Sequence, residues 1–175
     1  MLLHTHSIDQ TLALGRLLGT LAPPPPGLFC IALDGPLGAG KTHLTRGIAE
    51  GAGVDDPTLV SSPTYVLMNI YPGSKPIWHL DAYRITSEED FAALGMQEIF
   101  APPTLGGAGG GIVIIEWAAR VAGQLPSDHL HIEISHEDDT SRSFRLSPHG
   151  EVSKTVLNHL LHRWPAAHQQ AQQQQ

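Results

Sequence analysis

The sequence predicts an α/β domain, in which helices cover both faces of a central β-sheet. Two short apolar runs, at residues 28–33 and 112–115, have the length and composition of strands that are buried on both sides. A glycine-rich loop follows the first run, and residues 43–50 then place their apolar side chains on one helical face. This alternation of buried strands and helices predicts a mixed, mainly parallel sheet with the two apolar strands at its centre.

The first predicted element is a helix at residues 7–21, where leucine and isoleucine recur at helical spacing. Ser7 is its expected N-cap, and the proline run at residues 23–26 ends it because proline does not continue a helix. The helix after the glycine-rich loop is expected to end at residues 51–53, where glycines favour a C-terminal cap.

Residues 65–71 and 77–80 are rich in strand-forming residues and flank a turn at residues 72–75, which predicts an antiparallel hairpin. A helix with an acidic first turn is expected at residues 87–94. The glycine-rich stretch at residues 105–111 is expected to form a flexible loop that tolerates changes of length.

The C-terminal part predicts two half-exposed strands, a helix and a tail. Residues 130–134 and 143–146 alternate apolar and polar side chains, as strands with one buried face do. A last helix is expected at about residues 151–163, and the glutamine-rich residues 165–175 are expected to be disordered. The chain of 175 residues is therefore expected to form one nucleotide-binding domain, residues 1–164, followed by this tail.

The composition argues against several protein classes. No apolar run approaches the roughly 20 residues that span a bilayer, and no secretion signal is visible at the N-terminus. The single cysteine, Cys30, lies in a predicted buried strand and excludes a disulfide within one chain. We therefore expect a cytoplasmic protein without a membrane partner.

The charge balance argues against direct nucleic-acid binding. A formal net charge of −7, from 10 Lys plus Arg against 17 Asp plus Glu, leaves few cations to neutralise phosphates. DNA is therefore not an expected partner, and any RNA would be bound mainly by another protein. The 11 histidines are scattered without cysteines nearby, so a structural metal site is not expected either.

The glycine-rich loop carries the strongest chemical signal. Residues 35–42 fit the P-loop pattern Gly-x-x-x-x-Gly-Lys-[Ser/Thr], between a strand and a helix as the motif requires. The glycines let the backbone approach a ligand closely, and its N–H groups converge on phosphate at the positive end of the helix. Lys41 is expected to reach the β- and γ-phosphates, and the Thr42 hydroxyl to hold Mg²⁺. The predicted nucleotide-binding residues in this segment are Gly35, Leu37, Gly38, Ala39, Gly40, Lys41, Thr42 and His43. The predicted fold is thus a P-loop NTPase-like three-layer sandwich.

Two acids stand at the carboxyl ends of predicted strands, where α/β folds place their ligands. Glu116 follows residues 112–115, in the position of a carboxylate that binds or orients Mg²⁺; the alternative is an exposed acid that only ends a strand. Asp81 ends the predicted hairpin and could position a water molecule or the outer shell of the metal; alternatively it caps a turn or pairs with Arg84. Residues 61–65 could direct hydroxyl groups to a γ-phosphate, or form only a Ser-Pro turn.

Together these residues resemble the bacterial TsaE family (also called YjeE), small ATPases of tRNA threonylcarbamoyladenosine synthesis. The similarity covers about residues 7–146 and leaves out the last helix and the tail. Four runs carry it, in the family's order and at similar spacings: Gly35-Pro-Leu-Gly-Ala-Gly-Lys-Thr42, Ser62-Pro-Thr-Tyr65, His79-Leu-Asp-Ala-Tyr-Arg84 and Ile115-Glu-Trp117.

The resemblance implies an ATPase in which Lys41 and the loop amides bind the ATP phosphates, while Thr42 and Glu116 bind Mg²⁺. It also implies that Trp117 lies beside the nucleotide and that one threonine acts as a switch near the γ-phosphate. The implied catalytic residues are Asp81, Lys41 and Thr64, the last being that switch threonine. The family's partners are TsaB and TsaD, and ATP hydrolysis resets that pair between rounds of modification. The chain would therefore meet tRNA only through them.

This sequence departs from the family pattern at three places. Pro36 stands where the family often has an acidic or amide residue, His43 replaces a common hydroxyl residue, and the insert at residues 105–111 is unusual. None of these removes a predicted phosphate or metal ligand. Two other functions fit the same P-loop, namely a small-molecule kinase and a nucleotide-responsive adaptor with negligible turnover. Such kinases usually carry a lid with several arginines, and no lid-like arginine cluster is visible beyond the P-loop helix.

Overall fold

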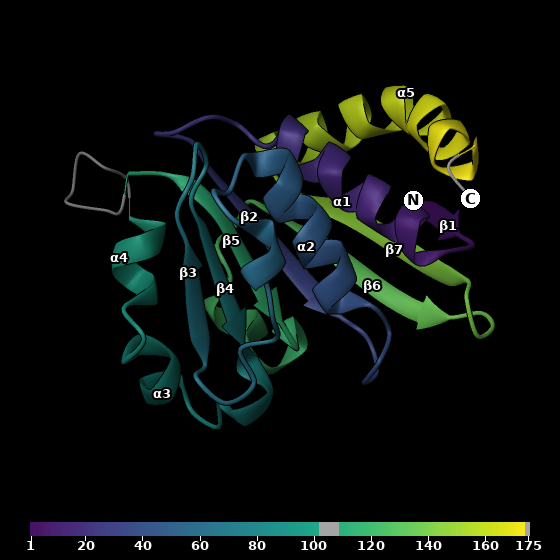
Figure 1. Cartoon of the computed structure of the whole chain (residues 1–175). Coiled ribbons are helices and arrows are strands. Elements are labelled where there is room, and N and C mark those ends of the chain that lie inside the picture. Colours follow the sequence, from purple (N-terminus) through teal and green to yellow (C-terminus); the bar gives the residue numbers. More distant parts are fainter. Residues whose placement is uncertain (102–108, 174–175) are drawn as a thin grey trace.

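The computed structural model of the chain describes residues 1–101 and 109–173. Within these residues the chain forms a seven-stranded sheet in the order β1-β7-β6-β2-β5-β4-β3, with α1 and α2 in front of it in Figure 1. The strands are β1 (Leu2–Thr5), β2 (Leu28–Asp34), β3 (Met68–Tyr71), β4 (Ile77–Asp81), β5 (Gly111–Glu116), β6 (His129–His136) and β7 (Arg142–His149). The helices are α1 (Ile8–Leu21), α2 (Lys41–Ala52), α3 (Glu88–Ala92), α4 (Met96–Phe100) and α5 (Glu151–Gln173), with short 3₁₀ segments η1 (Pro57–Leu59), η2 (Ala82–Arg84) and η4 (Ala118–Gln124).

The centre of the sheet is parallel and its flanks are antiparallel. β2 pairs in parallel with β5 and β6, and β4 pairs in parallel with β5. The pairs β3–β4, β6–β7 and β1–β7 are antiparallel. The predicted mixed sheet, which is parallel at its centre, and the predicted hairpin are therefore confirmed.

The two apolar runs lie at the centre, as predicted. β2 is the middle strand, and β5 beside it is buried at every position. In β2, Phe29 and Ile31 belong to one hydrophobic cluster, whereas Cys30 and Ala32 belong to a second cluster on the opposite face. A continuous apolar strand requires cover on both faces, and both clusters provide it.

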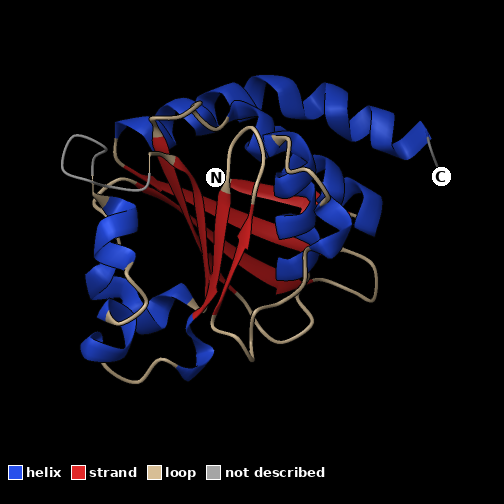
Figure 2. Cartoon of the chain, turned by 60° about the vertical axis from the view of Figure 1, so that its left-hand side comes forward, coloured by secondary structure: helices blue, strands red, loops and turns tan. Residues whose placement is uncertain are grey.

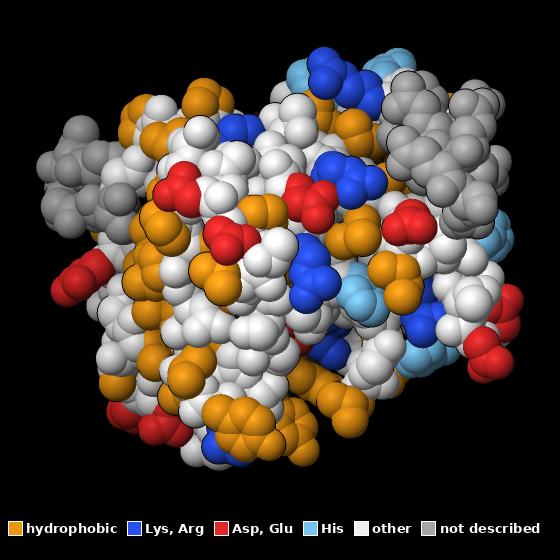
Figure 3. Space-filling view, viewed as in Figure 1, with side chains coloured by type: hydrophobic (Ala, Val, Ile, Leu, Met, Phe, Trp, Pro, Cys, Tyr) orange, Lys and Arg blue, Asp and Glu red, His pale blue; other side chains and the backbone are white. Residues whose placement is uncertain are grey.

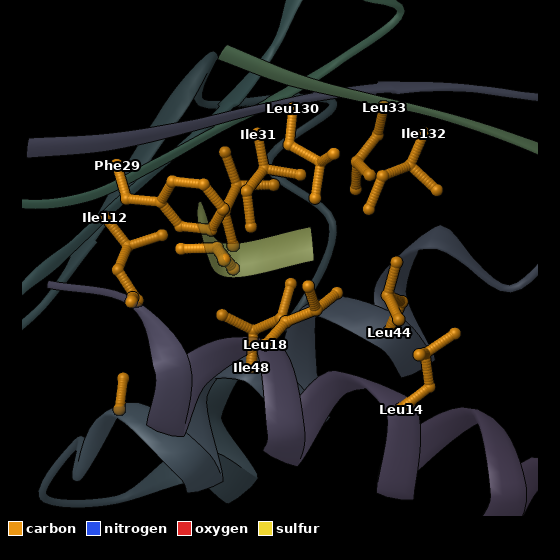
Figure 4. Packing of buried hydrophobic residues seen from close by; sticks show 14 of the residues in the cluster. Leu14, Leu18, Phe29, Ile31, Leu33, Leu44, Ile48, Ile112, Leu130 and Ile132 are labelled. Atoms are coloured by element: carbon orange, nitrogen blue, oxygen red, sulfur yellow. The ribbon is translucent and has the colours of Figure 1, made fainter. Parts of the chain in front are cut away.

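Helices cover the two faces separately, which makes the fold a three-layer sandwich (Figure 2). On one face Leu14 and Leu18 of α1 and Leu44 and Ile48 of α2 pack against side chains of the central strands (Figure 4). α5 contributes to the same cluster, and α3, α4 and η4 cover the opposite face. Burial of apolar side chains on both faces provides the main favourable free energy of folding.

α1 and α2 pack backbone against backbone through glycines. A Cβ atom on Gly15 or Gly19 of α1 would overlap the backbone of α2, and one on Gly47 or Gly51 of α2 would overlap that of α1. Because packed interiors have little room to adjust, this contact fixes the position of the helix that begins at Lys41.

The predicted helix ends are confirmed for the first two helices. The Ser7 hydroxyl caps α1 by accepting the N–H of Gln10 at 3.3 Å. α2 ends at Gly53, whose φ of 73° lies in the left-handed region that glycine adopts readily at a helix C-terminus.

Two predicted boundaries in the middle of the chain are wrong. β3 begins at Met68 rather than at residue 65, because the N–H groups of Val66 and Leu67 bond to the carbonyl of Pro63 and close a turn. The helix predicted at residues 87–94 is shorter, since α3 ends at Ala92, and α4, which begins after Gly95 with its left-handed φ of 72°, was not predicted.

The ends of the chain also differ from the prediction. β1 was not predicted; its pairing with β7 defines it. α5 extends to Gln173, past the predicted end at about residue 163 and past Pro165. Alanine and glutamine are good helix formers, which explains the longer helix although Pro165 lacks an N–H group. The division into a domain and a tail stays a prediction, and most of the glycine-rich loop at residues 105–111 lies outside the described residues.

Candidate functional site

The predicted P-loop lies between β2 and α2, at the carboxyl end of the middle strand (Figure 1). Gly38 and Gly40 have φ values of 76° and 100°, which only glycine adopts readily. A Cβ atom built on either residue would meet nothing within 4 Å. The space in front of these two residues is therefore open, as the close approach of a ligand to the backbone requires.

A cavity of about 290 Å³ opens beside this loop. Its lining comes from the P-loop, the segment before β3 and the ends of β4 and β5, and consists of Leu37, Gly38, Ala39, Gly40, Lys41, Thr42, His43, Ser62, Thr64, Asp81, Glu116 and Trp117. The fold thus brings together every predicted site residue except Gly35, which lies at the start of the loop. Ser62 belongs to the segment 61–65 whose hydroxyls were considered as possible γ-phosphate contacts, but it was not named as a site residue by itself.

Lys41 is nearly buried, with 6% of its surface exposed. Its ammonium group donates hydrogen bonds to the carbonyls of Gly35 and Pro36 at 2.9 and 3.1 Å. The same nitrogen lies 4.5 Å from the centroid of the Trp117 ring. Carbonyl oxygens and an aromatic face both favour a positive charge, so these contacts hold the ammonium group of Lys41 at the wall of the cavity.

Trp117 has an unusual backbone conformation. Its φ of 58° is left-handed, which is uncommon for a residue with a side chain. Its ring centroid lies 5.3 Å from that of Tyr83. Strain of this kind costs roughly 1–3 kcal/mol and collects at functional sites. The strained residue Trp117 comes directly after Glu116, and its indole ring is the one that contacts Lys41.

Asp81 has two sets of partners. Its Oδ1 accepts the N–H of Tyr83 at 2.8 Å and so caps η2, as the alternative interpretation predicted. Its Oδ2 accepts the hydroxyls of Thr64 at 2.7 Å and of Ser62 at 3.5 Å. The alternative ion pair with Arg84 is not formed among the described residues; the Arg84 guanidinium lies 4.9 Å from the centroid of the Tyr65 ring instead.

Glu116 is buried, with 3% of its surface exposed, so the alternative prediction of an exposed strand-end acid is wrong. Its Oε1 lies 2.9 Å from Nε2 of His79 on the neighbouring strand. Buried carboxylates are costly unless they are paired, and this contact provides one partner.

The donor set of the cavity fits Mg²⁺. Thr42 supplies a hydroxyl and Glu116 a carboxylate, both of which are oxygen ligands of the kind that Mg²⁺ prefers. In the described part of the chain, no three His, Cys, Asp or Glu side chains are grouped to hold a metal ion by themselves. Few protein ligands are typical of Mg²⁺ sites, because this ion keeps water and phosphate oxygens in its shell.

An ion pair lies directly behind the P-loop. Nε2 of His131 is 2.9 Å from Oδ2 of Asp34, the residue before the loop, and Asp34 also accepts the N–H of Ala119 at 3.2 Å. Burial raises the pKa of Asp34, but the bonds from His131 and Ala119 outweigh it, so the pKa lies below the ordinary 3.8. The hydrogen bond to Asp34 raises the pKa of His131 above the ordinary 6.5.

A second cavity, of about 270 Å³, continues on the far side of the P-loop. It shares Gly38, Gly40 and His43 with the first cavity, and it reaches Ser7, Ile8, Thr11, Asp139, Thr140 and Arg142. Arg142 donates from Nε to the carbonyl of Ala39 at 3.2 Å and so ties β7 to the loop. Burial lowers the pKa of His43, as do the charges of Arg46 and Arg142, so this side chain stays neutral near pH 7.

No helix in the described parts of the chain is both long and apolar enough to cross a membrane.

Comparisons with known proteins match most of the chain. Residues 5–144 match a family model described as threonylcarbamoyl adenosine biosynthesis protein TsaE. The tRNA threonylcarbamoyladenosine biosynthesis protein TsaE of Bacillus subtilis is 35% identical over 153 residues, which cover 87% of this chain and 88% of that relative. The protein of the same name from Nostoc sp. is 35% identical over 145 residues, covering 80% and 81%. The crystal structure of Bacillus subtilis YdiB is similar with a TM-score of 0.70 and 27% identity, covering 93% and 95%.

Proposed function

The chain belongs to the TsaE family of threonylcarbamoyl adenosine biosynthesis proteins, and from this premise we propose that it is an Mg²⁺-dependent ATPase acting with TsaB and TsaD. Family membership supports a part in the threonylcarbamoyladenosine modification of tRNA. ATP hydrolysis and contact with TsaB and TsaD are further steps, and each draws its support from the geometry of the site.

The triphosphate binds along the P-loop. The N–H groups from Leu37 to Thr42 lie at the positive end of α2, where phosphate is favoured. Lys41 adds a full positive charge beside the β- and γ-phosphates. The nucleoside extends past His43 into the second cavity, toward Arg142.

Thr42 and Glu116 hold the metal ion, which when bound neutralises charge on the phosphate oxygens. Asp81 is the group that orients the attacking water, because its carboxylate lines the same cavity as Lys41 and Thr64. In this conformation the hydroxyls of Thr64 and Ser62 bond to Oδ2 of Asp81. Hydrolysis therefore requires Thr64 to turn away from Asp81 toward the γ-phosphate, which makes the enzyme slow on its own.

Exposed apolar side chains near the cavity support a protein partner. Leu37 and Tyr65 are 89% and 84% exposed, and Val66 and Tyr83 are also exposed. Figure 3 shows hydrophobic side chains gathered at the lower edge of the molecule. Apolar groups of this kind are typical of protein interfaces. TsaB and TsaD cover these side chains in the cytoplasm. Because this chain carries a net charge of −7, it has few cations to bind tRNA directly, and tRNA is bound through these partners.

The single observation that carries the proposal is the convergence of Lys41, Thr42, Thr64, Asp81 and Glu116 on one cavity. The test is phosphate release from ATP, measured with this protein alone and with TsaB and TsaD added. We expect slow release alone and faster release with the partners. A requirement for a small-molecule acceptor would favour a kinase instead, and absence of turnover under both conditions would favour a nucleotide-responsive adaptor.

A further inference from the structure

His79 on β4 is a fully buried histidine beside Glu116 on β5. In the parallel register of the two strands, Asp81 lies opposite Glu116, and His79 lies two residues before Asp81 on the same face of the sheet. Nε2 of His79 and Oε1 of Glu116 are 2.9 Å apart, and 0% and 4% of the two side chains are exposed. His79 and Glu116 thus form a buried hydrogen bond, and of the two only Glu116 lines the cavity.

Packing alone does not explain a histidine at this position. A carboxylate that binds Mg²⁺ only accepts hydrogen bonds, so Nε2–H of His79 donates the hydrogen bond to Oε1 of Glu116. Nδ1 of the same ring is buried and has no hydrogen-bond partner among the described residues. An apolar side chain of similar size would fill the space without leaving a nitrogen unpaired. The contact with Glu116 is therefore the feature that a histidine adds.

This contact leaves Glu116 with one oxygen held and one oxygen available. Oε1 is engaged by His79, and no described residue donates a hydrogen bond to Oε2. A glutamate side chain has three rotatable bonds, so without such a partner its carboxylate would occupy several orientations. Groups that hydrogen-bond a metal-binding side chain reduce this freedom, and their loss weakens metal binding by about 10- to 100-fold.

We infer that His79 is a positioning residue of the Mg²⁺ site, which orients the Glu116 carboxylate toward the ion. His79 is not among the residues that line the cavity, so it acts through Glu116 rather than on the nucleotide. The inference rests on the proposed function, because it needs Mg²⁺ to bind together with ATP.

The test compares His79→Gln with His79→Asn by calorimetric titration of ATP over a series of Mg²⁺ concentrations. The amide nitrogen of glutamine reaches about as far from the backbone as Nε2, so it can donate to Oε1. The shorter asparagine ends near the place of Nδ1 and does not reach. We expect His79→Asn to raise the Mg²⁺ concentration for half-maximal tightening of ATP binding by about tenfold or more, and His79→Gln to stay close to the wild type. ATP affinity without Mg²⁺ should be the same in all three proteins.

Leu80→Ala is the matched control, because Leu80 is the next residue of β4 and is buried on the opposite face of the sheet. It should lower the melting temperature without changing the Mg²⁺ requirement. An unchanged requirement in His79→Asn, with a raised one in Glu116→Gln, would overturn the inference and leave the proposed function standing. Equal shifts in His79→Asn and His79→Gln would also overturn it, since they would point to packing. If Mg²⁺ has no effect on ATP binding by the wild type, the inference and the proposed function both fail.

Discussion

Replacement of Asp81 by asparagine should separate nucleotide binding from hydrolysis. One oxygen of Asp81 caps η2 through the N–H of Tyr83, and the other accepts the hydroxyl of Thr64. Asparagine keeps an oxygen for the cap and presents an NH₂ group toward Thr64, whose hydroxyl can accept as well as donate. The shape and the cap are therefore retained, and the carboxylate alone is lost.

The expected magnitudes differ between asparagine and alanine. Loss of one positioned polar catalytic group lowers the rate by ~10²-fold or more, which should appear in both Asp81→Asn and Asp81→Ala. Loss of the cap costs ~1 kcal/mol, and removing the acceptor of the Thr64 hydroxyl adds to it, so Asp81→Ala should lose roughly 1–3 kcal/mol of stability. Asp81→Asn should stay within about 1 kcal/mol of the wild type. ATP affinity should change by only a few-fold in either variant, because in the proposed role Asp81 would stabilise the transition state more than bound ATP.

The assay measures melting temperature, ATP affinity and phosphate release on one preparation of each variant. The comparison of Asp81→Asn with Asp81→Ala separates a catalytic role from a structural one, because only the second variant removes the cap. Near-normal phosphate release per folded molecule from Asp81→Asn would refute the catalytic role and leave the cap of η2 as the function of Asp81.

Three further predictions follow from the structure. Lys41→Ala should largely abolish ATP binding in a calorimetric titration, because the positive charge expected beside the phosphates is lost. An unchanged ATP affinity would contradict the assignment of residues 35–42 as a phosphate-binding P-loop. Gly47→Ala should lower the melting temperature and weaken ATP binding, since the added methyl group would overlap the backbone of Leu12; a melting temperature equal to that of the wild type would contradict the tight packing of α1 on α2. His131→Gln should reduce the free energy of unfolding at about pH 5–6 and not at pH 8–9. The raised pKa of His131 makes its contribution present below 6.5 and lost as the pH rises through the folded value, while the lowered pKa of Asp34 keeps the carboxylate charged above 3.8. A loss of stability independent of pH would show that the charge of His131 does not contribute.

The elements that were predicted correctly depend on signals within a few residues. The P-loop is recognised by the spacing of its glycines and Lys41, and the central strands by uninterrupted apolar runs. Glu116 and Asp81 were chosen as candidates because each stands at the end of a predicted strand, and the structure places both at the last positions of paired parallel strands, at one edge of the sheet.

The features that were missed depend on partners distant in the sequence. β1 is defined by its pairing with β7, and its four residues are too few to give a clear local signal. The hydrogen bond between His79 and Glu116 depends on the register of β4 against β5, which no single segment encodes. For the same reason the pair formed by Asp34 and His131, 97 residues apart, was not predicted.

The most direct measurement is the number of threonylcarbamoyladenosine residues formed in tRNA per TsaB–TsaD complex, with an excess of this protein and ATP. If hydrolysis at the P-loop resets the partners, the wild-type protein should support many rounds of modification. Asp81→Asn, which is expected to retain the fold and ATP binding, should support about one round. Equal product with the wild type and Asp81→Asn, measured with a variant whose phosphate release is shown to be impaired, would contradict the coupling of ATP hydrolysis to tRNA modification.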